Sequence, residues 1–142
     1  MTKEKLSSSL EDYLEVIYNI IDKSEKVRAI DISRELNVSR ASVTEALKKL
    51  ADKQLINYGR YDMISMTEEG KKQALGVIEK HNTLQYFFEE IMGLEHAEAA
   101  TTACKIEHII SQNVLDRFTA LKNFHKTNPE YIEAFQKYYR DK

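Results

Sequence analysis

Three side chains that bind divalent metals lie close together in the second half of the chain. Cys104, Glu107 and His108 are spaced at i, i+3 and i+4, which places a thiol, a carboxylate and an imidazole on one face of a helix. A mixed ligand set of this kind suits a divalent first-row transition metal, and its selectivity depends on geometry and metal availability. This spacing predicts a metal site.

Further candidate ligands lie in two other segments. Asp12 and Glu15 are three residues apart near the N-terminus, and His81 lies near the middle of the chain. Each residue also has an ordinary structural interpretation: the acidic pair as a solvated helix face, His81 as a hydrogen-bonded core histidine, and Cys104 as a small buried side chain. The metal hypothesis therefore depends on the combination and not on any one residue.

The composition limits the kind of protein that carries these residues. The chain has 142 residues, of which 42% are hydrophobic and 31% charged, with only 4 Gly and 1 Pro. These values favour a helix-dominated protein of one or two compact units. The single cysteine excludes an internal disulfide and a four-cysteine zinc module. The N-terminus is polar and no apolar run reaches the roughly 18 residues of a membrane span, so we expect a cytoplasmic protein with no membrane partner.

Hydrophobic periodicity predicts the elements of the first half. Apolar residues at helical spacing predict helices over residues 8–22, 29–36 and 40–53. Asn37 is expected to end the second helix in a turn or left-handed conformation, and Ser39 to cap the third. Two β-prone runs, residues 55–58 and 63–66, predict a small hairpin in which Gly59 is available for a positive φ.

The sequence pattern predicts that the second half of the chain is helical. One long helical pattern begins near Thr67 and ends at Gly93, a further helix covers residues 95–121, and Pro129 precedes a last helix over residues 130–139. The expected fold is mainly α, with an N-terminal winged helix-turn-helix in residues 1–72 and an all-helical domain in residues 73–142. The apolar face of 95–121, with the segment FQKYY, is expected to form a homodimer.

Three helices followed by a hairpin is the order of a winged helix-turn-helix. In this arrangement the third helix enters the major groove of double-stranded DNA and the hairpin lies along the adjacent backbone or minor groove. Residues 36–60 carry five basic against two acidic side chains, a patch suited to phosphates, although a solvated helix face or a protein-binding winged helix would have the same composition. The candidate DNA-binding residues are Ser39, Arg40, Ser42, Thr44, Lys48, Lys49, Tyr58, Arg60 and Tyr61.

Several motifs carry a resemblance over nearly the whole chain. They are SSLEDYLEVIY at the start, the segment NVSRASVTEALKKL, Lys80 with His81, IMGL at 91–94 and ACKIEH at 103–108. In this order they resemble the diphtheria-toxin-repressor family of metal-dependent transcriptional regulators. Family members have a winged-helix domain followed by a helical domain that binds metal and dimerises. In length the chain is similar to the short, manganese-responsive branch, which lacks an SH3-like domain.

The resemblance implies a function and a set of ligands. It implies a homodimeric regulator that binds operator DNA, represses metal-uptake genes and is activated by Fe(II) or Mn(II). One principal metal per subunit is implied, which ties the first helix to the dimerisation domain and shifts the population towards the DNA-competent arrangement. The implied ligands, not all bound at once, are Asp12, Glu15, His81, Cys104, Glu107 and His108.

The ligand positions combine features of both branches of the family. Asp12 matches the acidic pair of the manganese regulators, where iron regulators have methionine, whereas Cys104 matches the iron regulators. Gln85 and Ala100 stand where the iron regulators have a glutamate and a histidine of an ancillary site. We therefore expect that ancillary site to be lost. A thiolate ligand favours iron, cobalt or zinc over manganese, whereas the acidic pair resembles the manganese regulators. Fe(II) and Mn(II) are therefore both expected candidates for the activating ion.

Two other classes of function are compatible with some of these residues. In a thiol-based redox regulator Cys104 would be oxidised and metal would be irrelevant, but an apolar helical setting predicts low reactivity. A metalloenzyme would need an open coordination position, a general base and a substrate cleft. The sequence has no HExxH motif and no Gly-rich phosphate loop, so we expect neither enzymatic activity nor a small organic substrate.

Overall fold

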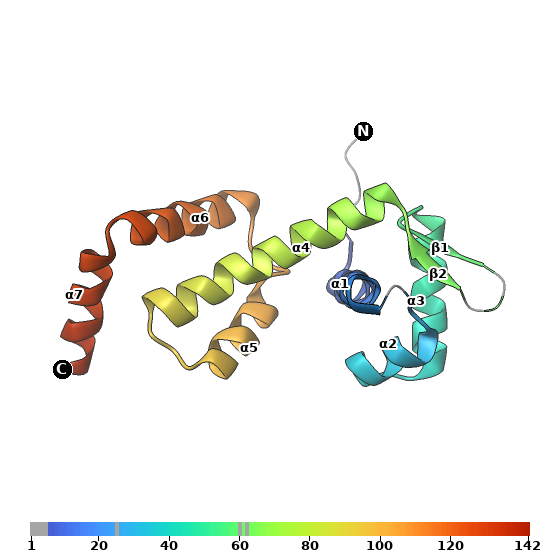
Figure 1. Ribbon diagram of the computed structural model, residues 1–142, viewed down its shortest axis with the longest axis horizontal. Helices are drawn as coiled ribbons and strands as arrows, with labels where there is room; N and C mark the ends of the chain where they lie inside the picture. Colours follow the sequence, from blue (N-terminus) through green and yellow to red (C-terminus); the bar gives the residue numbers. More distant parts are fainter. Residues whose placement is uncertain (1–5, 25, 60, 62) are drawn as a thin grey trace. The chain divides into compact units, whose positions relative to one another are not determined.

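The computed structural model describes residues 6–24, 26–59, 61 and 63–142. These residues form two compact units, one extending to Val77 and the other comprising Ile78–Lys142. The boundary falls inside helix α4, Glu68–Tyr86 (Figure 1). In the described part of the chain, every helix is too short or too polar to cross a membrane.

The first unit begins with three helices, as the periodicity predicts. Two serine side chains cap them: Ser7 Oγ accepts from the Leu10 N–H at 3.2 Å, and Ser39 Oγ accepts from the Ser42 N–H at 3.1 Å. Asn37 ends the second helix with φ 54° and ψ 51°, which confirms the expected left-handed conformation. The helices are α1 (Ser8–Ser24), α2 (Ala29–Leu36) and α3 (Arg40–Asp52).

A two-stranded antiparallel hairpin follows α3. Strands β1 (Ile56–Tyr58) and β2 (Ile64–Met66) pair with Ile56 opposite Met66. The expected positive φ at Gly59 is wrong: among the described residues of this turn it is Tyr61 that adopts one, at 64°. The reason is that the Gly59 N–H donates to the Met63 carbonyl at 3.1 Å, which prolongs the strand pairing by one residue.

The core of the first unit is built from the inward faces of these elements. Helix α1 packs against α2 and α3, and α3 contacts β1. The side chains at its centre are completely buried, as the alternation of apolar and polar residues requires. They are Leu14, Ile17, Ile32, Val43, Leu47 and Leu50. The winged helix-turn-helix prediction is confirmed.

The second unit is all helical. Helix α4 passes at Phe87–Ile91 into a π-helical turn, η2, and Gly93 ends this segment with φ 79°. The remaining elements are α5 (His96–Ile106), α6 (Gln112–Thr127) and α7 (Pro129–Arg140). Helix α6 packs on η2 and on α7, and α5 also packs on η2.

The single helix expected over residues 95–121 is wrong, because the segment is divided between α5 and α6. Ser111 starts the new helix, since its side chain accepts from the Val114 N–H at 3.2 Å and its carbonyl accepts from the Leu115 N–H at 3.0 Å. A serine that caps a helix offers the backbone an alternative to continuing the preceding one. Consequently, Glu107 and His108 lie at the end of α5 and not within a longer helix.

The wing joins α4 through Thr67 and Gly70. The Thr67 hydroxyl donates to the carbonyls of Gln54 and Leu55 at 2.8 and 3.0 Å, and its oxygen accepts from the Gly70 N–H at 2.9 Å. A Cβ atom at Gly70 would lie 1.9 Å from the Leu55 carbonyl oxygen, whereas a Cβ at Gly76 would meet no atom within 4 Å. Glycine at position 70 is therefore required for helix and strand to approach this closely.

We predict that Gly70→Ala lowers the free energy of unfolding by about 3 kcal/mol, the upper end of usual overpacking costs. The matched substitution Gly76→Ala on the same helix should raise it by about 0.5–1 kcal/mol, because alanine is the better helix former. Urea denaturation followed by circular dichroism measures both. A Gly70→Ala protein as stable as the parent would contradict this packing.

Candidate metal centre and nucleic-acid interface

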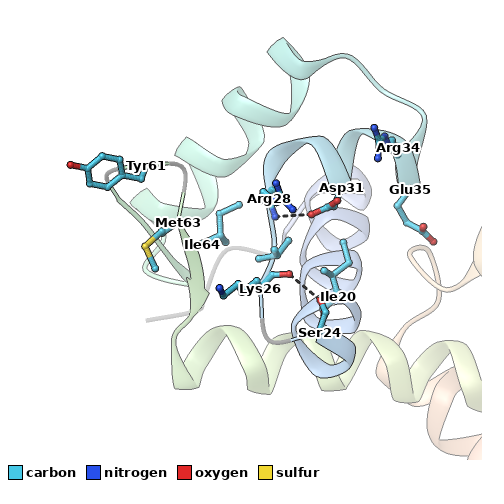
Figure 2. A pocket seen from close by; sticks show the side chains of 11 residues that line it. Ile20, Ser24, Lys26, Arg28, Asp31, Arg34, Glu35, Tyr61, Met63 and Ile64 are labelled. Carbon is cyan, nitrogen blue, oxygen red and sulfur yellow. Dashed lines mark hydrogen bonds between the residues drawn. The ribbon is translucent and has the colours of Figure 1, made fainter.

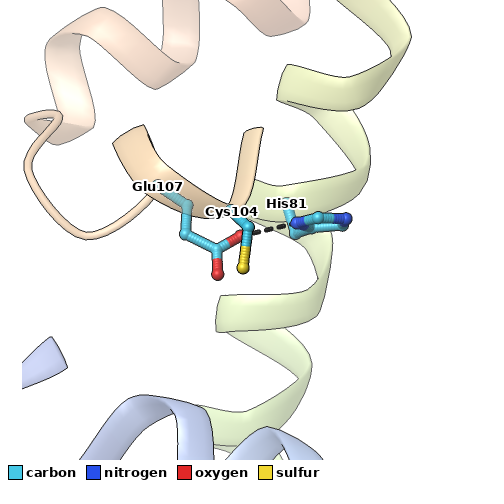
Figure 3. A group of neighbouring side chains, drawn as sticks. All are labelled: His81, Cys104 and Glu107. Carbon is cyan, nitrogen blue, oxygen red and sulfur yellow. Dashed lines mark hydrogen bonds and ion pairs between the residues drawn. The ribbon is translucent and has the colours of Figure 1, made fainter. Parts of the chain in front are cut away.

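Three of the predicted metal ligands come together inside the second unit. His81 lies on α4, Cys104 on α5, and Glu107 immediately after α5. One ligand atom from each of these side chains lies within 4.8 Å of the other two. Figure 3 shows the imidazole of His81 pointing towards the carboxylate and thiol presented by the α5 segment.

The Glu107 carboxylate is at the centre of this group. Its side chain is only 1% exposed, and its Oε2 lies 2.8 Å from His81 Nδ1. Its Oε1 is buried and has no hydrogen-bond partner among the described residues, although His108 Nε2 is 3.4 Å away. An ionised carboxylate in such a place is costly unless positive charge or hydrogen bonds compensate it. The donor set therefore fits a divalent cation, which would supply that charge.

The other side chains of the group differ in their access to solvent. Cys104 is exposed, so the interpretation of this residue as a small buried side chain is wrong. The His81 and His108 side chains are 19% and 9% exposed. A thiol at the surface and a carboxylate in the interior give the site one solvent-facing and one buried ligand.

The two remaining predicted ligands belong to the first unit. Asp12 and Glu15 are half-buried on successive turns of α1, next to the fully buried Leu14 of the core. Their side chains are thus on the helix that packs against α2 and α3.

The predicted DNA-binding residues of α3 are mostly exposed. Arg40, Ser42, Lys48 and Lys49 face solvent, and Lys49 forms an ion pair with Glu45 at 3.6 Å. Two hydroxyl groups have structural roles in addition. The Ser39 hydroxyl caps α3, and the Thr44 hydroxyl donates to the Arg40 carbonyl at 3.0 Å.

The wing residues separate into different environments. Tyr61 is 92% exposed at the tip. Tyr58 is half-buried and packs against the hydrophobic core. Arg60 lies outside the described residues. Of the two predicted wing residues that the structure describes, Tyr61 is therefore the more exposed.

A groove of about 860 Å³ lies beside the wing in the first unit (Figure 2). Lys26, Arg28 and Arg34 line it together with Asp31 and the wing residue Tyr61. Asp31 accepts a hydrogen bond from the Arg28 N–H at 3.1 Å and so caps α2. The sequence prediction did not include these basic side chains, because the basic patch was sought in residues 36–60. Lys26 and Arg28 precede α2 and Arg34 lies within it, and this local group of basic residues is the signal that would have indicated them.

Two family models match the chain over most of its length. The model described as "Iron dependent repressor, N-terminal DNA binding domain" matches residues 5–64. The model described as "Iron dependent repressor, metal binding and dimerisation domain" matches residues 67–135. The two matches together cover most of both units of the structure.

Curated relatives share about a third of their residues with this chain. An HTH-type transcriptional regulator of Methanocaldococcus jannaschii is 36% identical over 113 residues, which is 79% of this chain and 90% of the relative. The HTH-type transcriptional regulator MntR of Oceanobacillus iheyensis is 33% identical over 129 residues, 91% of this chain and 87% of the relative.

Solved structures with the same fold include manganese regulators. "Structure of the manganese regulator SloR" superposes with a TM-score of 0.72 and 26% identity, covering 87% of this chain. A manganese-dependent transcriptional repressor in complex with manganese gives 0.74 and 27%, covering 81% of this chain. This chain spans only 55% and 53% of those two proteins. The T. acidophilum IdeR structure, at 24% identity and a TM-score of 0.70 over 82% of this chain and 54% of its own, shares the fold.

We predict that Cys104→Ala changes metal preference without lowering stability, because this side chain is exposed and its sulfur lies within 4.8 Å of ligand atoms of His81 and Glu107. With Co²⁺ as the probe, the parent protein should show thiolate-to-metal charge-transfer absorption that the variant lacks, and the variant should lose affinity for softer metals relative to Mn²⁺. Thr101→Ala, an exposed substitution one turn earlier on α5, is the control. An unchanged absorption spectrum and metal ranking would remove Cys104 from the site.

Proposed function

This chain belongs to the iron-dependent repressor family, and from that premise we propose that its metal centre controls how tightly a homodimer of the chain binds operator DNA. It is a metal-dependent, DNA-binding transcriptional regulator, and the divalent ion is Fe(II) or Mn(II). The proposed targets are metal-uptake genes, which the dimer represses when the ion is plentiful. The cytoplasm is the proposed location.

The observation that carries this proposal is the buried Glu107 carboxylate with His81 and Cys104 around it. His81, Cys104, Glu107 and His108 would hold the ion on the side of the dimerisation domain. On the family resemblance, we propose that Asp12 and Glu15 complete the ligand set. When bound, the ion would supply positive charge next to the buried carboxylate. The carboxylate and the two imidazoles would coordinate it from fixed directions and so suit it better than water does.

The ligands on α1 give the ion its influence on DNA binding. Helix α1 packs directly on α2 and α3, so any constraint on Asp12 and Glu15 is passed to the recognition helix. A domain held in one orientation samples fewer arrangements, and the DNA-competent one becomes more populated. The proposed domains are residues 1–72 for DNA binding and 73–142 for metal binding and dimerisation.

The proposed DNA contacts follow from exposure and chemistry. Arg40 is suited to a bidentate contact with guanine, and the Ser42 hydroxyl to a base or a phosphate. Lys48 and Lys49 would meet phosphates. The remaining candidates of the sequence, Ser39, Thr44, Tyr58, Arg60 and Tyr61, keep their proposed roles, and the groove adds Lys26 and Arg28 as phosphate contacts.

The homodimer needs an apolar surface, and the second unit offers one. Helix α6 has no buried residue among those described, although it carries several large apolar side chains. The rings of Phe124 on α6 and Tyr131 on α7 pack together with their centroids 5.6 Å apart, and both side chains are exposed. We propose that this surface is the dimer interface, together with the other exposed apolar side chains Ile109, Val114, Phe135, Tyr138 and Tyr139.

Specific observations argue against the two alternative functions, a thiol-based redox switch and an enzyme. The relatives are transcriptional regulators and give no support to a thiol-based redox switch. Cys104 lies beside His81 and Glu107, which is the setting of a metal ligand. We propose that the chain has no enzymatic activity, because its family consists of repressors.

Selection of DNA fragments tests the proposed function. Fragmented source-genome DNA is offered anaerobically to the purified full chain in Mn²⁺, Fe²⁺, Zn²⁺ or a chelator. We predict that a few fragments containing an inverted repeat are recovered with Fe²⁺ or Mn²⁺ and lost in chelator. Inverted symmetry is expected because a dimer presents its two recognition helices to two half-sites.

Two variants distinguish sequence-specific DNA contacts from general electrostatic attraction to DNA. Arg40→Ala should weaken binding to the recovered fragment and relax its sequence preference, at a cost of about 1–3 kcal/mol. Lys72→Ala, an exposed substitution on α4 outside the proposed interface, should leave binding unchanged. Recovery of the same fragments in chelator would contradict metal control and return Asp12, Glu15 and Cys104 to purely structural roles.

A further inference from the structure

We propose that Gln85 is a positioning residue, which holds Nε2 of His81 so that Nδ1 is the nitrogen turned towards the metal centre. This inference rests on the proposed function, because it concerns the same site. Gln85 is one turn after His81 on α4, and its Oε1 lies 3.1 Å from His81 Nε2. The other ring nitrogen, Nδ1, lies 2.8 Å from Glu107 Oε2.

The orientation of the Gln85 amide follows from its second partner. Its Nε2 donates to Glu89 Oε2 at 3.2 Å, and a carboxylate only accepts hydrogen bonds. The amide oxygen must therefore face His81. Because that oxygen is an acceptor, the hydrogen atom between the two side chains belongs to His81 Nε2. Nδ1, which faces the acceptor oxygen Oε2 of Glu107 at 2.8 Å, is then the nitrogen whose hydrogen a metal would replace.

A second pair keeps Glu89 in place as the acceptor. His96, at the start of α5, approaches Glu89 with its Nδ1 at 2.9 Å from Oε1 and 3.1 Å from Oε2. The hydrogen bonds from His96 and Gln85 lower the pKa of the Glu89 carboxyl, so Glu89 remains ionised under ordinary conditions. Glu89 also lies in the π-helical turn η2, which packs on α5.

The chain of hydrogen bonds from His81 through Gln85 to Glu89 explains why residue 85 has an amide side chain. Only a side chain that accepts on one side and donates on the other can join an imidazole N–H to a carboxylate. A glutamate at position 85 would accept from His81 but would face Glu89 with a like charge. Methionine has a similar length and could do neither. Metal-bound histidines commonly donate their second N–H to such a partner, and loss of that partner typically lowers metal affinity about 10–100-fold.

A second glutamine on α4, Gln73, shows what a glutamine–glutamate hydrogen bond contributes on its own. Gln73 donates to Glu69 Oε1 at 3.2 Å, the same residue types at the same spacing, reversed in order. Such pairs stabilise a helix by only about 0.2–0.5 kcal/mol. Gln73→Met is therefore the control for Gln85→Met, because each substitution removes one glutamine–glutamate hydrogen bond.

The test compares the full-length parent, Gln85→Met, Gln85→Glu and Gln73→Met. The ring nitrogens of ¹⁵N-labelled His81 in the metal-free protein report by NMR which nitrogen carries hydrogen, and calorimetry with Mn²⁺ alone gives the affinity. In the parent, Gln85→Glu and Gln73→Met, Nε2 of His81 should carry hydrogen. Gln85→Met should no longer hold hydrogen at Nε2 and should bind Mn²⁺ at least about tenfold more weakly, with an unchanged amide spectrum elsewhere.

Two outcomes overturn the inference. One is a Gln85→Met protein with the parental His81 nitrogen signals and Mn²⁺ affinity, and the other is a parent in which Nε2 carries no hydrogen. A parent that binds neither Mn²⁺ nor Fe²⁺ contradicts the proposed function instead. In that case the NMR signals of the metal-free proteins still decide whether Gln85 fixes His81.

Discussion

The candidate metal centre of this protein depends on one unfavourable interaction, the burial of the Glu107 carboxylate. Its side chain is 1% exposed and one of its oxygens is without a hydrogen bond among the described residues. Burial of a charge in this way is costly unless a cation or a full set of donors compensates it. His81 supplies one hydrogen bond and Cys104 lies within reach. The three proposed ligands thus have atoms that lie within 4.8 Å of one another.

Helix α4 belongs to both units, because the boundary between them falls within it. It begins at the Thr67 and Gly70 junction with the wing and contains His81 in its C-terminal half. The first unit has its own buried core, so the recognition helix is well supported there without metal. What metal would control is therefore the orientation of a preformed DNA-binding domain, and not its folding.

Much of this fold could be predicted from sequence, because periodicity and caps specify helices locally. Helix α2 begins and ends where the pattern predicts, and Asn37 has the expected conformation. The division of 95–121 was missed because Ser111 resembles any polar residue on a helix until its cap hydrogen bond is seen. Gln85 was noticed only as a replaced ligand. Its partners Glu89 and His96 depend on η2 and on the packing of α5, which no local pattern specifies.

The most direct test of metal control measures Mn²⁺ affinity with and without a recovered operator fragment, for the parent and for Glu107→Gln, which keeps the size of the side chain and removes its charge. Binding equilibria are reciprocal, so operator must tighten Mn²⁺ binding by the same factor by which Mn²⁺ tightens operator binding. We expect that common factor to exceed about fivefold, the lower end of usual allosteric coupling, and to disappear in Glu107→Gln. Operator binding that is equally tight in Mn²⁺ and in chelator would contradict a metal-controlled regulator.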